Sequence, residues 1–286
     1  MLTEELLVPK HAELASLEMT YYDSQDDKNR DDVLVLVHGT AGSTASHFGF
    51  LFPVLAAKQR VISIDWSNPS EESGSSPLQL EHLANQVIEL IERTVPGRKV
   101  ALLGYSLGAV VTAVVAAQRP DLVDRLILVS GWIKTDQQQL LRNDIWRTLR
   151  DLDDDTVLRQ YSTFCAFGGP FLADKTRDDL APGMNAMKFD HFGDRQMDLN
   201  RRIDITESAH TIECPTLVVG CTHDQMVPVR HQQALFGAIQ DSRYVEIPTG
   251  HAVVFERPSE LSHHIQQFMD LPDQYPAGTI IPTPAP

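Results

Sequence analysis

The sequence predicts an α/β fold, in which a mostly parallel sheet is flanked by helices. Short runs of β-branched apolar residues alternate with longer amphipathic stretches, as is typical of parallel strands that crossover helices bury on both faces. The chain has 286 residues, of which 42% are hydrophobic and 22% charged, so it can form a full core. Its elements follow the order βαβα, apart from one interruption after residue 129.

Six apolar runs predict buried strands, and residues 14–23 predict one or two more. The six are Val33–Val37, Val61–Ile64, Val100–Leu103, Leu126–Val129, Leu217–Val219 and Tyr244–Ile247. Two helices are expected between them. Residues 80–91 carry apolar side chains at helical spacing, and residues 109–117 form a run of small residues suited to close packing on a sheet.

The interruption lies between Val129 and Leu217, where no run has the pattern of a buried strand. Residues 136–149 and 153–167 predict two helices, and residues 172–180 and 195–205 carry weaker helical patterns. A segment of this length is not a loop. We therefore expect a helical insertion that sits on the sheet domain.

The last sixteen residues, 271–286, hold five prolines and cannot form a regular helix. We expect Tyr275, Ile280 and Ile281 to dock on the domain or on a neighbouring subunit. The tail is therefore the candidate contact of a homodimer.

The charge balance narrows the range of partners. With 39 acidic and 24 basic residues the formal net charge is −15. Nucleic acids and anionic membranes attract basic surfaces, so neither is expected as a partner. A highly anionic substrate is disfavoured for the same reason, although a local basic pocket can override the long-range field. We expect a small-molecule substrate.

Cysteine usage and the N-terminal region favour the cytoplasm. Residues 1–20 are interrupted by charged side chains, so no signal peptide is expected, and no segment reaches the roughly 18 apolar residues needed to cross a bilayer. Cys214 and Cys221 bracket an extended run and cannot form a disulfide, and with Cys165 they are expected to be reduced thiols. No spacing of metal ligands occurs, so neither a metal nor a cofactor is expected.

A candidate nucleophile lies where a strand meets a helix. Strand Val100–Leu103 leads into Gly104-Tyr105-Ser106-Leu107-Gly108 and then directly into a helix. The small residues two positions before and after the serine allow a sharp turn that raises Oγ above the sheet. A bare G-x-S-x-G motif is common in glycine-rich turns, but the flanking strand and helix make this one specific. Ser106 is therefore the predicted nucleophile.

A serine hydroxyl is a weak nucleophile at neutral pH, so it requires a base, and the base requires an acid that fixes its tautomer. After this kind of turn, the acid and the histidine are expected later in the chain, each just beyond a strand. Asp224 follows strand Leu217–Val219, and His251 follows strand Tyr244–Ile247. The sequence thus predicts a triad of Ser106, His251 and Asp224.

Other residues compete for the two partner roles. Among eleven histidines, His251 is the one that combines a preceding glycine with a strand end. Asp204 competes with Asp224 for the acid, but it falls in the helical insertion. Asp241 also competes, but its position is more typical of the start of a turn.

An oxyanion requires two backbone N–H donors aimed at it. Leu107 follows the nucleophile at a helix N-terminus and is expected to supply one. The other is expected from the loop after strand Val33–Val37, which reads His38-Gly39-Thr40-Ala41-Gly42-Ser43, with Thr40 as the candidate. Gly39 is expected to contact the substrate. A plain glycine turn would not explain why this loop lies beside the elbow at the carboxyl edge of the sheet.

The aromatic residues of the helical insertion are expected mainly to hold it together and to attach it to the sheet. They are Trp132, Trp146, Tyr161, Phe164, Phe167 and Phe171. Trp132 differs because it comes directly after a strand whose carboxyl end faces the expected pocket. We assign Trp132 and Met226 to substrate binding, and both imply an apolar acyl or alcohol portion.

With these residues in place, the chain resembles the α/β-hydrolase fold proteins, and among them the branch with a serine nucleophile and a helical cap. His38-Gly39, Ser106, Asp224 and His251 stand in the order of that family, and the resemblance covers residues 30–270. It implies an eight-stranded sheet, a helical cap inserted after the sixth strand, and acyl-enzyme chemistry. Residues 1–131 and 209–270 would form the core, residues 132–208 the cap and residues 271–286 a proline-rich tail.

The chain also departs from parts of the family. A serine in place of an aspartate separates it from the dehalogenase and epoxide-hydrolase branches. Residues 65–69 lack the usual glycine-rich turn, and the loop at His38 lacks the Gly-Pro-Gly run of many carbon–carbon bond hydrolases.

Three functions are compatible with the residues. The first is a serine hydrolase that cleaves an ester, lactone or thioester of a medium-sized, largely apolar metabolite. The second keeps the triad but performs acyl transfer, carbon–carbon cleavage, elimination or cofactor-free oxygen chemistry, because a fold does not fix a reaction. The third is a ligand-binding protein that does not catalyse.

Overall fold

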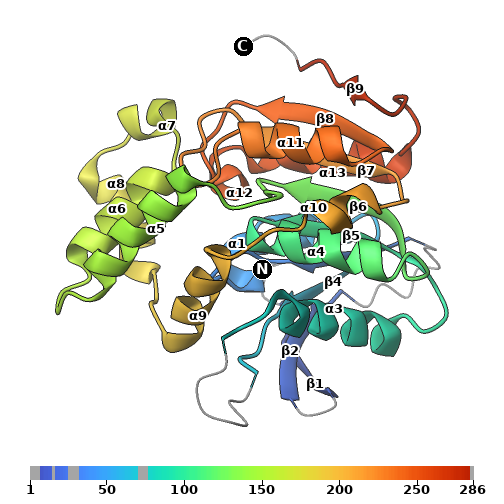
Figure 1. The fold of residues 1–286 in the computed structure, drawn as a ribbon, viewed down its shortest axis with the longest axis horizontal. Coiled ribbons are helices and arrows are strands. Elements are labelled where there is room, and N and C mark those ends of the chain that lie inside the picture. The colour runs from blue at the N-terminus through green and yellow to red at the C-terminus, as the bar shows by residue number, and fades with distance from the viewer. Residues whose placement is uncertain (1–6, 15–16, 25–31, 70–76, 284–286) are drawn as a thin grey trace.

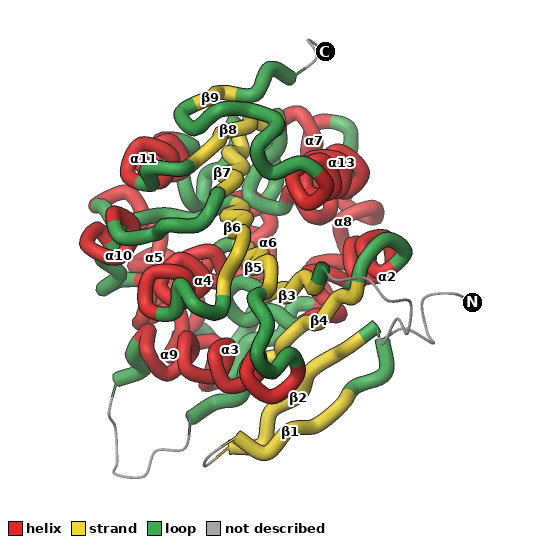
Figure 2. The backbone as a smooth tube through the Cα atoms, turned by 90° about the vertical axis from the view of Figure 1, so that its right-hand side faces the viewer, coloured by secondary structure: helices red, strands yellow, loops and turns green. Residues whose placement is uncertain are grey.

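A computed structural model describes residues 7–14, 17–24, 32–69 and 77–283. Across these residues a single sheet of nine strands runs in the order β1-β2-β4-β3-β5-β6-β7-β8-β9. Helices cover both faces of the sheet, as the side view in Figure 2 shows. The prediction of an α/β fold with a mostly parallel sheet is confirmed.

The sheet is antiparallel at one edge and parallel elsewhere. β1 pairs with β2, and β2 with β4, in antiparallel register, and the other neighbouring pairs are parallel. β3 and β5 are buried at every residue, because they lie at the centre of the sheet and helices cover both faces. The strands are β1 Lys10–Leu14, β2 Leu17–Asp23, β3 Val33–Val37, β4 Arg60–Asp65, β5 Val100–Tyr105, β6 Val123–Val129, β7 Thr216–Cys221, β8 Ser242–Ile247 and β9 Thr279–Ile280.

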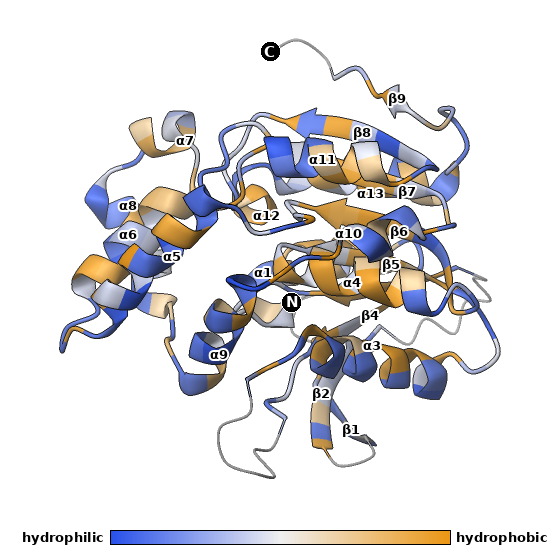
Figure 3. Cartoon of the chain, in the orientation of Figure 1, coloured by the Kyte–Doolittle hydropathy of each residue, from blue (hydrophilic) through white to orange (hydrophobic). Residues whose placement is uncertain are grey.

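Two sets of helices bury the two faces. One hydrophobic cluster joins a face of the sheet to α3, α4, α10 and α11, and a second joins the opposite face to α1, α2, α12 and α13. α4 is mainly orange in Figure 3 because it is apolar almost all round, as its central position requires. The bounds of these helices are α1 Thr44–Phe48, α2 Leu51–Ala56, α3 Leu80–Thr94, α4 Leu107–Gln118, α10 Thr206–His210, α11 Arg230–Ala238, α12 Val253–Glu256 and α13 Pro258–Asp270.

Between β6 and β7 the chain forms helices joined by loops and no strand. In Figure 1 α5 to α8 gather at one end of the sheet. Trp146, Leu158 and Met197 form a small hydrophobic cluster of their own there, against which Tyr161 packs. Phe164 is exposed, contrary to the expectation that it helps to hold this segment together. The helices are α5 Gln137–Arg150, α6 Thr156–Ala166, α7 Gly169–Ala173, α8 Arg177–Ala186 and α9 His191–Asn200, followed by α10.

The boundaries of a separate cap at residues 132–208, called the cap segment from here on, stay a prediction. Ile203 and Ile205, near the end of that range, belong to the large cluster on the α4 face of the sheet. The last part of the cap segment therefore packs as core.

The sheet has one strand more than the resemblance implies, because the C-terminal tail adds β9 to β8. The Gly278 N–H donates to the Ser242 carbonyl at 2.8 Å, and the Ile281 N–H donates to the Tyr244 carbonyl at 2.7 Å. A parallel edge strand leaves backbone groups unpaired, and the tail satisfies some of them here.

Docking of the tail follows the expectation in part. Ile281 packs against the cluster that contains α13, and the half-buried Tyr275 offers its carbonyl to Arg243 Nε at 2.8 Å. Ile280 is 65% exposed, so it does not dock on its own domain, and its docking on a neighbouring subunit stays a prediction. Successive residues of a strand face opposite sides of the sheet, so Ile280 and Ile281 do not both face the core. The homodimer contact stays a prediction.

Two further expectations concern the whole chain. No helix within the described ranges is long and apolar enough to cross a membrane. Cys165, Cys214 and Cys221 are free thiols, and burial raises the pKa of the Cys221 thiol to about 12. The expectation of no signal peptide concerns residues 1–20, of which residues 1–6 and 15–16 lie outside the described part of the chain.

Candidate active site

Ser106 lies on a strained turn between β5 and α4. Its backbone has φ 58° and ψ −122°, a conformation that a residue with a side chain rarely adopts. A Cβ on Gly104 would lie 2.3 Å from the Gly108 carbonyl oxygen, and one on Gly108 would lie 2.0 Å from the Val37 carbonyl oxygen. The two glycines therefore let the turn close tightly against β3.

The structure brings the three predicted triad residues together from three separate strand ends. His251 Nε2 lies 2.9 Å from Ser106 Oγ, and His251 Nδ1 lies 2.7 Å from Asp224 Oδ2. β5, β7 and β8 are parallel, so their carboxyl ends share one edge of the sheet. This geometry is that of a hydroxyl, a base and an orienting acid in a row.

Asp224 is held so that one oxygen serves the histidine. Its Oδ1 accepts the N–H groups of Met226 and Val227, each at 2.8 Å, and its Oδ2 faces His251. The carboxylate therefore requires the hydrogen on His251 Nδ1, and this leaves Nε2 as an acceptor toward Ser106. The exposed fractions of Ser106, Asp224 and His251 are 8%, 6% and 5%, so solvent screens their interactions weakly.

The competing aspartates lie in other ion pairs. Asp204 Oδ2 lies 2.7 Å from Lys134 Nζ, and Asp241 forms an ion pair with Arg243. Asp204 lies in the loop between α9 and α10, and Asp241 lies directly before β8. Neither aspartate faces His251 in the described part of the chain.

Two histidines fix the loop that follows β3. The Gly39 N–H donates to His47 Nδ1 at 3.1 Å, and the Gly39 carbonyl lies 2.8 Å from His38 Nδ1, which must donate to it. His38 Nε2 accepts the Trp66 N–H at 3.3 Å, so both ring nitrogens of His38 are used. Burial lowers the pKa of both imidazoles, that of His47 to about 3, so both are neutral near pH 7.

This loop presents an unused N–H group beside Ser106. A Cβ on Gly39 would lie 2.8 Å from Ser106 Cβ, so the loop backbone packs directly against Ser106. A trans peptide points its C=O and the following N–H in opposite directions, so the Thr40 N–H is directed away from His38. Among the described residues neither the Thr40 nor the Leu107 N–H has a hydrogen-bond acceptor. These are the two groups expected to hold an oxyanion.

Helix α9 of the cap segment holds the same loop from the other side. Asn200 Nδ2 donates to Thr40 Oγ1 at 2.9 Å, and the Ala41 N–H donates to Gln196 Oε1 at 2.9 Å. Ala41 has φ 53°, and the Gly42 N–H closes the turn on the Gly39 carbonyl. The loop is thus preorganised by side chains that lie about 155 residues away in the chain.

Glu256 ties the cap segment to the loop that carries His251. Its Oε1 accepts the N–H groups of Gly168 at 2.9 Å and Gly250 at 3.0 Å, and the Ala252 N–H donates to the Ala166 carbonyl at 2.8 Å. A Cβ on Gly250 would lie 2.3 Å from the Gly168 nitrogen, so only glycine permits this approach. The end of α6 therefore lies beside His251.

Several of these supporting residues carry no sequence signal. His47 lies five residues beyond a glycine turn, and Glu256 lies in a segment without a motif. The Tyr105 hydroxyl donates to the His251 carbonyl at 2.9 Å, although position 105 is an unspecified position of the G-x-S-x-G motif. Their roles depend on contacts between segments that are distant in the chain.

The two predicted pocket side chains take different positions. Trp132 is 2% exposed, belongs to the core cluster on the α4 face and donates its Nε1–H to Thr135 Oγ1 at 2.9 Å. Met226 is half-buried and packs against the same cluster. Contact of either side chain with a substrate stays a prediction.

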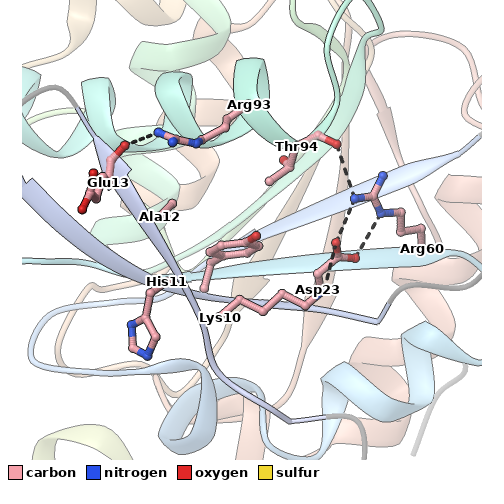
Figure 4. A pocket seen from close by; sticks show the side chains of 9 residues that line it. Lys10, His11, Ala12, Glu13, Asp23, Arg60, Arg93 and Thr94 are labelled. Atoms are coloured by element: carbon pink, nitrogen blue, oxygen red, sulfur yellow. Dashed lines mark hydrogen bonds and ion pairs between the residues drawn. The ribbon is translucent and has the colours of Figure 1, made fainter.

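A cavity of about 400 Å³ lies away from these residues, at the β1 and β2 edge of the sheet (Figure 4). Arg60 donates to both oxygens of Asp23, and Lys10 Nζ lies 3.5 Å from the same carboxylate. Arg93 donates to the Glu13 carbonyl. The three cations that line the cavity are thus already partnered. Its lining also holds no nucleophile with an adjacent base, so this cavity is not a candidate active site.

The close packing at Gly108 leads to a prediction about stability. We expect Gly108→Ala to lower the free energy of unfolding by about 3 kcal/mol, because the new methyl group must push α4 away from the end of β3. Gly237→Ala on α11 is the matched control, since no atom lies within 4 Å of its Cβ position. That change is expected to leave stability equal or to raise it by about 0.5–1 kcal/mol. Equal stabilities of the two variants in urea unfolding would show that the contact at Gly108 is unimportant.

The neutral His47 leads to a prediction about pH. Its pKa is about 3 in the folded chain and near 6.5 when unfolded, so between these values the unfolded state takes up a proton that the folded state does not. Stability therefore falls as the pH is lowered below about 6.5. His47→Asn keeps an acceptor for the Gly39 N–H but does not titrate. The stability of this variant should therefore fall less steeply with pH than that of the wild type, and the two slopes should differ by up to about 1.4 kcal/mol per pH unit. Urea unfolding at several pH values between 5 and 7.5 measures both slopes, and identical slopes would contradict the prediction.

The comparisons with known proteins agree with this architecture. A family model described as the alpha/beta hydrolase fold matches residues 32–258, and the chain belongs to that family. A relative named pyrrolizixenacetamide deacetylase, from Xenorhabdus hominickii, is 32% identical over 82% of this chain and 90% of that protein. The uncharacterized hydrolase YugF of Bacillus subtilis (strain 168) is 24% identical over 87% of this chain and 93% of its own length. The solved enol-lactonase from Burkholderia xenovorans LB400 superposes with a TM-score of 0.75 at 20% identity, over 91% of this chain and 100% of that chain, and shows the same fold.

Proposed function

We propose that the protein is a serine hydrolase that cleaves an ester, lactone or thioester of a medium-sized, largely apolar metabolite through an acyl-enzyme intermediate. The observation that carries this proposal is the pair of distances at His251, which are 2.9 Å from Nε2 to Ser106 Oγ and 2.7 Å from Nδ1 to Asp224 Oδ2. The family to which the chain belongs, and the relatives named as hydrolases, support the same reaction class.

The proposed reaction has two halves. Ser106 Oγ attacks the carbonyl carbon while its proton passes to His251 Nε2, and the N–H groups of Leu107 and Thr40 stabilise the negative charge on the carbonyl oxygen. The C–O or C–S bond to the leaving group then breaks, and His251 returns the proton to that group. Water, deprotonated by His251, attacks the acyl-enzyme in turn, and the acid leaves as Ser106 regains its proton.

Amide hydrolysis is the second candidate, because the 32% identical relative is named a deacetylase of an acetamide. The steps are the same, but the leaving group is an amine that must receive the proton from His251 before it departs. An ester and an amide with the same acetyl group, such as phenyl acetate and acetanilide, separate the two candidates.

Hydrolysis in labelled water distinguishes the proposal from transfer, elimination or oxygen chemistry on the same residues. The acid released from p-nitrophenyl butyrate in H₂¹⁸O is expected to carry one ¹⁸O per turnover, because water attacks the acyl-enzyme. The expected specificity constant lies in the ordinary range of enzymes, about 10⁴ M⁻¹s⁻¹ or more. Release of the alcohol without ¹⁸O in the acid, or no turnover of any ester, thioester, lactone or amide, would refute the proposal.

A further inference from the structure

The cap segment contains an arginine that differs from the others around it. Four arginines of this segment lie in ion pairs with carboxylates: Arg147 with Asp198, Arg150 with Asp194, Arg159 with Asp155 and Arg201 with Asp144. Arg142 on α5 has no such partner in the described part of the chain. Its Nε is buried and has no hydrogen-bond acceptor there.

Arg142 lies where the cap segment meets the proposed active site. The Tyr161 hydroxyl of α6 donates to the Arg142 backbone carbonyl at 3.1 Å, which fixes α5 against α6. One turn further along α6 lies the buried Cys165, and Ala166 beside it accepts the Ala252 N–H next to His251. Arg142 is electrostatically coupled to Tyr161, to Cys165 and to Asp224 of the candidate triad. Arg142 therefore lies on a helix that packs against α6, and the last turn of α6 lies beside the His251 loop.

A half-buried guanidinium whose Nε has no acceptor is costly for the folded protein. Removing a charge from water is compensated only by partners that accept its hydrogen bonds, and arginine is seldom buried without them. Here burial lowers the pKa of Arg142, and electrostatic interactions with Cys165, Tyr161 and Asp224 only partly offset this effect. Asp224 cannot become the partner, since its two oxygens already serve Met226, Val227 and His251. The guanidinium is thus left available to a ligand.

We propose that Arg142 binds a carboxylate of the substrate, at a distance from the carbonyl that Ser106 attacks. The planar guanidinium matches a carboxylate in a two-bond fork, which fixes orientation as well as charge. The substrate is then a monoanionic acid ester or amide whose remaining surface is apolar. This inference rests on the proposed function, and it names the substrate class of that site. It is compatible with a net charge of −15, because a single half-buried cation acts locally.

The test compares the hydrolysis of matched neutral and anionic substrates by variants with substitutions on α5. In the first pair the anion is mono-p-nitrophenyl glutarate, whose carboxylate is on the acyl side, and the neutral partner is p-nitrophenyl hexanoate. In the second pair the anion is 4-acetoxybenzoate, whose carboxylate is on the leaving group, and the neutral partner is its methyl ester. For at least one pair, Arg142→Met is expected to lower kcat/KM for the anion by about 30-fold or more, and to change it for the neutral partner by less than about threefold.

Two further variants separate binding from folding. Arg142→Lys keeps the charge but not the fork, so it should recover part of the loss. Arg147→Met on the same helix is the matched control, because Arg147 is exposed and paired with Asp198, and it should leave both substrates unchanged. An equal fall for anion and neutral partner in Arg142→Met, or no fall in either pair, would overturn the inference.

A binding measurement makes the two proposals independent of each other. The change in Tm caused by glutarate, relative to glutaramide at equal ionic strength, is compared between the wild-type protein and Arg142→Met. If neutral esters are hydrolysed but neither the anion preference nor the Tm shift depends on Arg142, the inference fails and the proposed function stands. If no ester or amide is hydrolysed, yet glutarate raises the Tm of the wild type alone, the proposed function fails and the carboxylate site stands. If no ester or amide is hydrolysed and glutarate does not change the Tm, both proposals fail.

Discussion

Ser106→Ala is expected to lower kcat for p-nitrophenyl butyrate by about 10⁴-fold or more, because it removes the atom that forms the acyl-enzyme in the proposed reaction. The oxyanion donors and the binding of the substrate remain, so some rate above the uncatalysed reaction should persist. Stability should change little, since the hydroxyl contacts only His251 Nε2 among the described residues. Steady-state kinetics and thermal unfolding on the same preparation measure both effects.

Ser130→Ala is the matched control for this experiment. Ser130 is also buried, also has a positive φ, of 52°, and also follows a parallel strand of the sheet, but its Oγ contacts Cys221 Sγ at 3.1 Å. It should retain most of the activity. If Ser106→Ala stayed active while Ser130→Ala did not, the nucleophile would be misassigned.

Asp224→Asn is expected to lower kcat by about 10⁴-fold through the tautomer of His251. The N–H groups of Met226 and Val227, at 2.8 Å each, require an oxygen, so the amide oxygen of the asparagine must face them. Its NH₂ group then faces His251 Nδ1 and donates to it. The ring hydrogen moves to Nε2, which can no longer accept the proton of Ser106. The loss should therefore appear in kcat with little change in KM.

The competing acids provide the controls. Asp204→Asn and Asp241→Asn alter residues that pair with Lys134 and Arg243, away from His251, and should retain the activity of the wild type. Kinetics of the three variants with one ester decide among the candidates. A loss confined to Asp204→Asn or Asp241→Asn would show that the acid is that residue and not Asp224.

The parallel strands could be predicted because burial on both faces leaves a continuous apolar run. β3 and β5 are buried at every residue, and their sequences show it. The residues after β5, β7 and β8 then had to share one edge of the sheet, so Ser106, Asp224 and His251 could be grouped without coordinates. The sharp turn at Ser106 could be read from its glycines for the same local reason.

The supports of the site could not be predicted, because they come from packing between distant segments. Glu256 bridges Gly168 and Gly250, and His47 holds Gly39. No motif in the sequence around Glu256 or His47 indicates these roles. Arg142 is a further case, since whether a surface-type residue on an amphipathic helix is paired depends on the helix that it faces.

The ninth strand shows a similar limit. A proline-rich tail has no strand pattern, and β9 forms because two N–H groups of the tail meet carbonyls at the free edge of β8. Which of Ile280 and Ile281 turns inward depends on the register of that short pairing. Composition alone cannot set the register.

Acylation of Ser106 during turnover is the step on which the proposed reaction depends. It can be measured directly as the mass of the intact protein after reaction with a fluorophosphonate, and after acid quench during turnover of p-nitrophenyl butyrate, followed by mapping of the labelled peptide. A single adduct is expected in each case, located on Ser106 and absent from Ser106→Ala. A stoichiometric adduct on another residue, or an active enzyme that forms no adduct with either reagent, would contradict the assignment of Ser106 as the nucleophile.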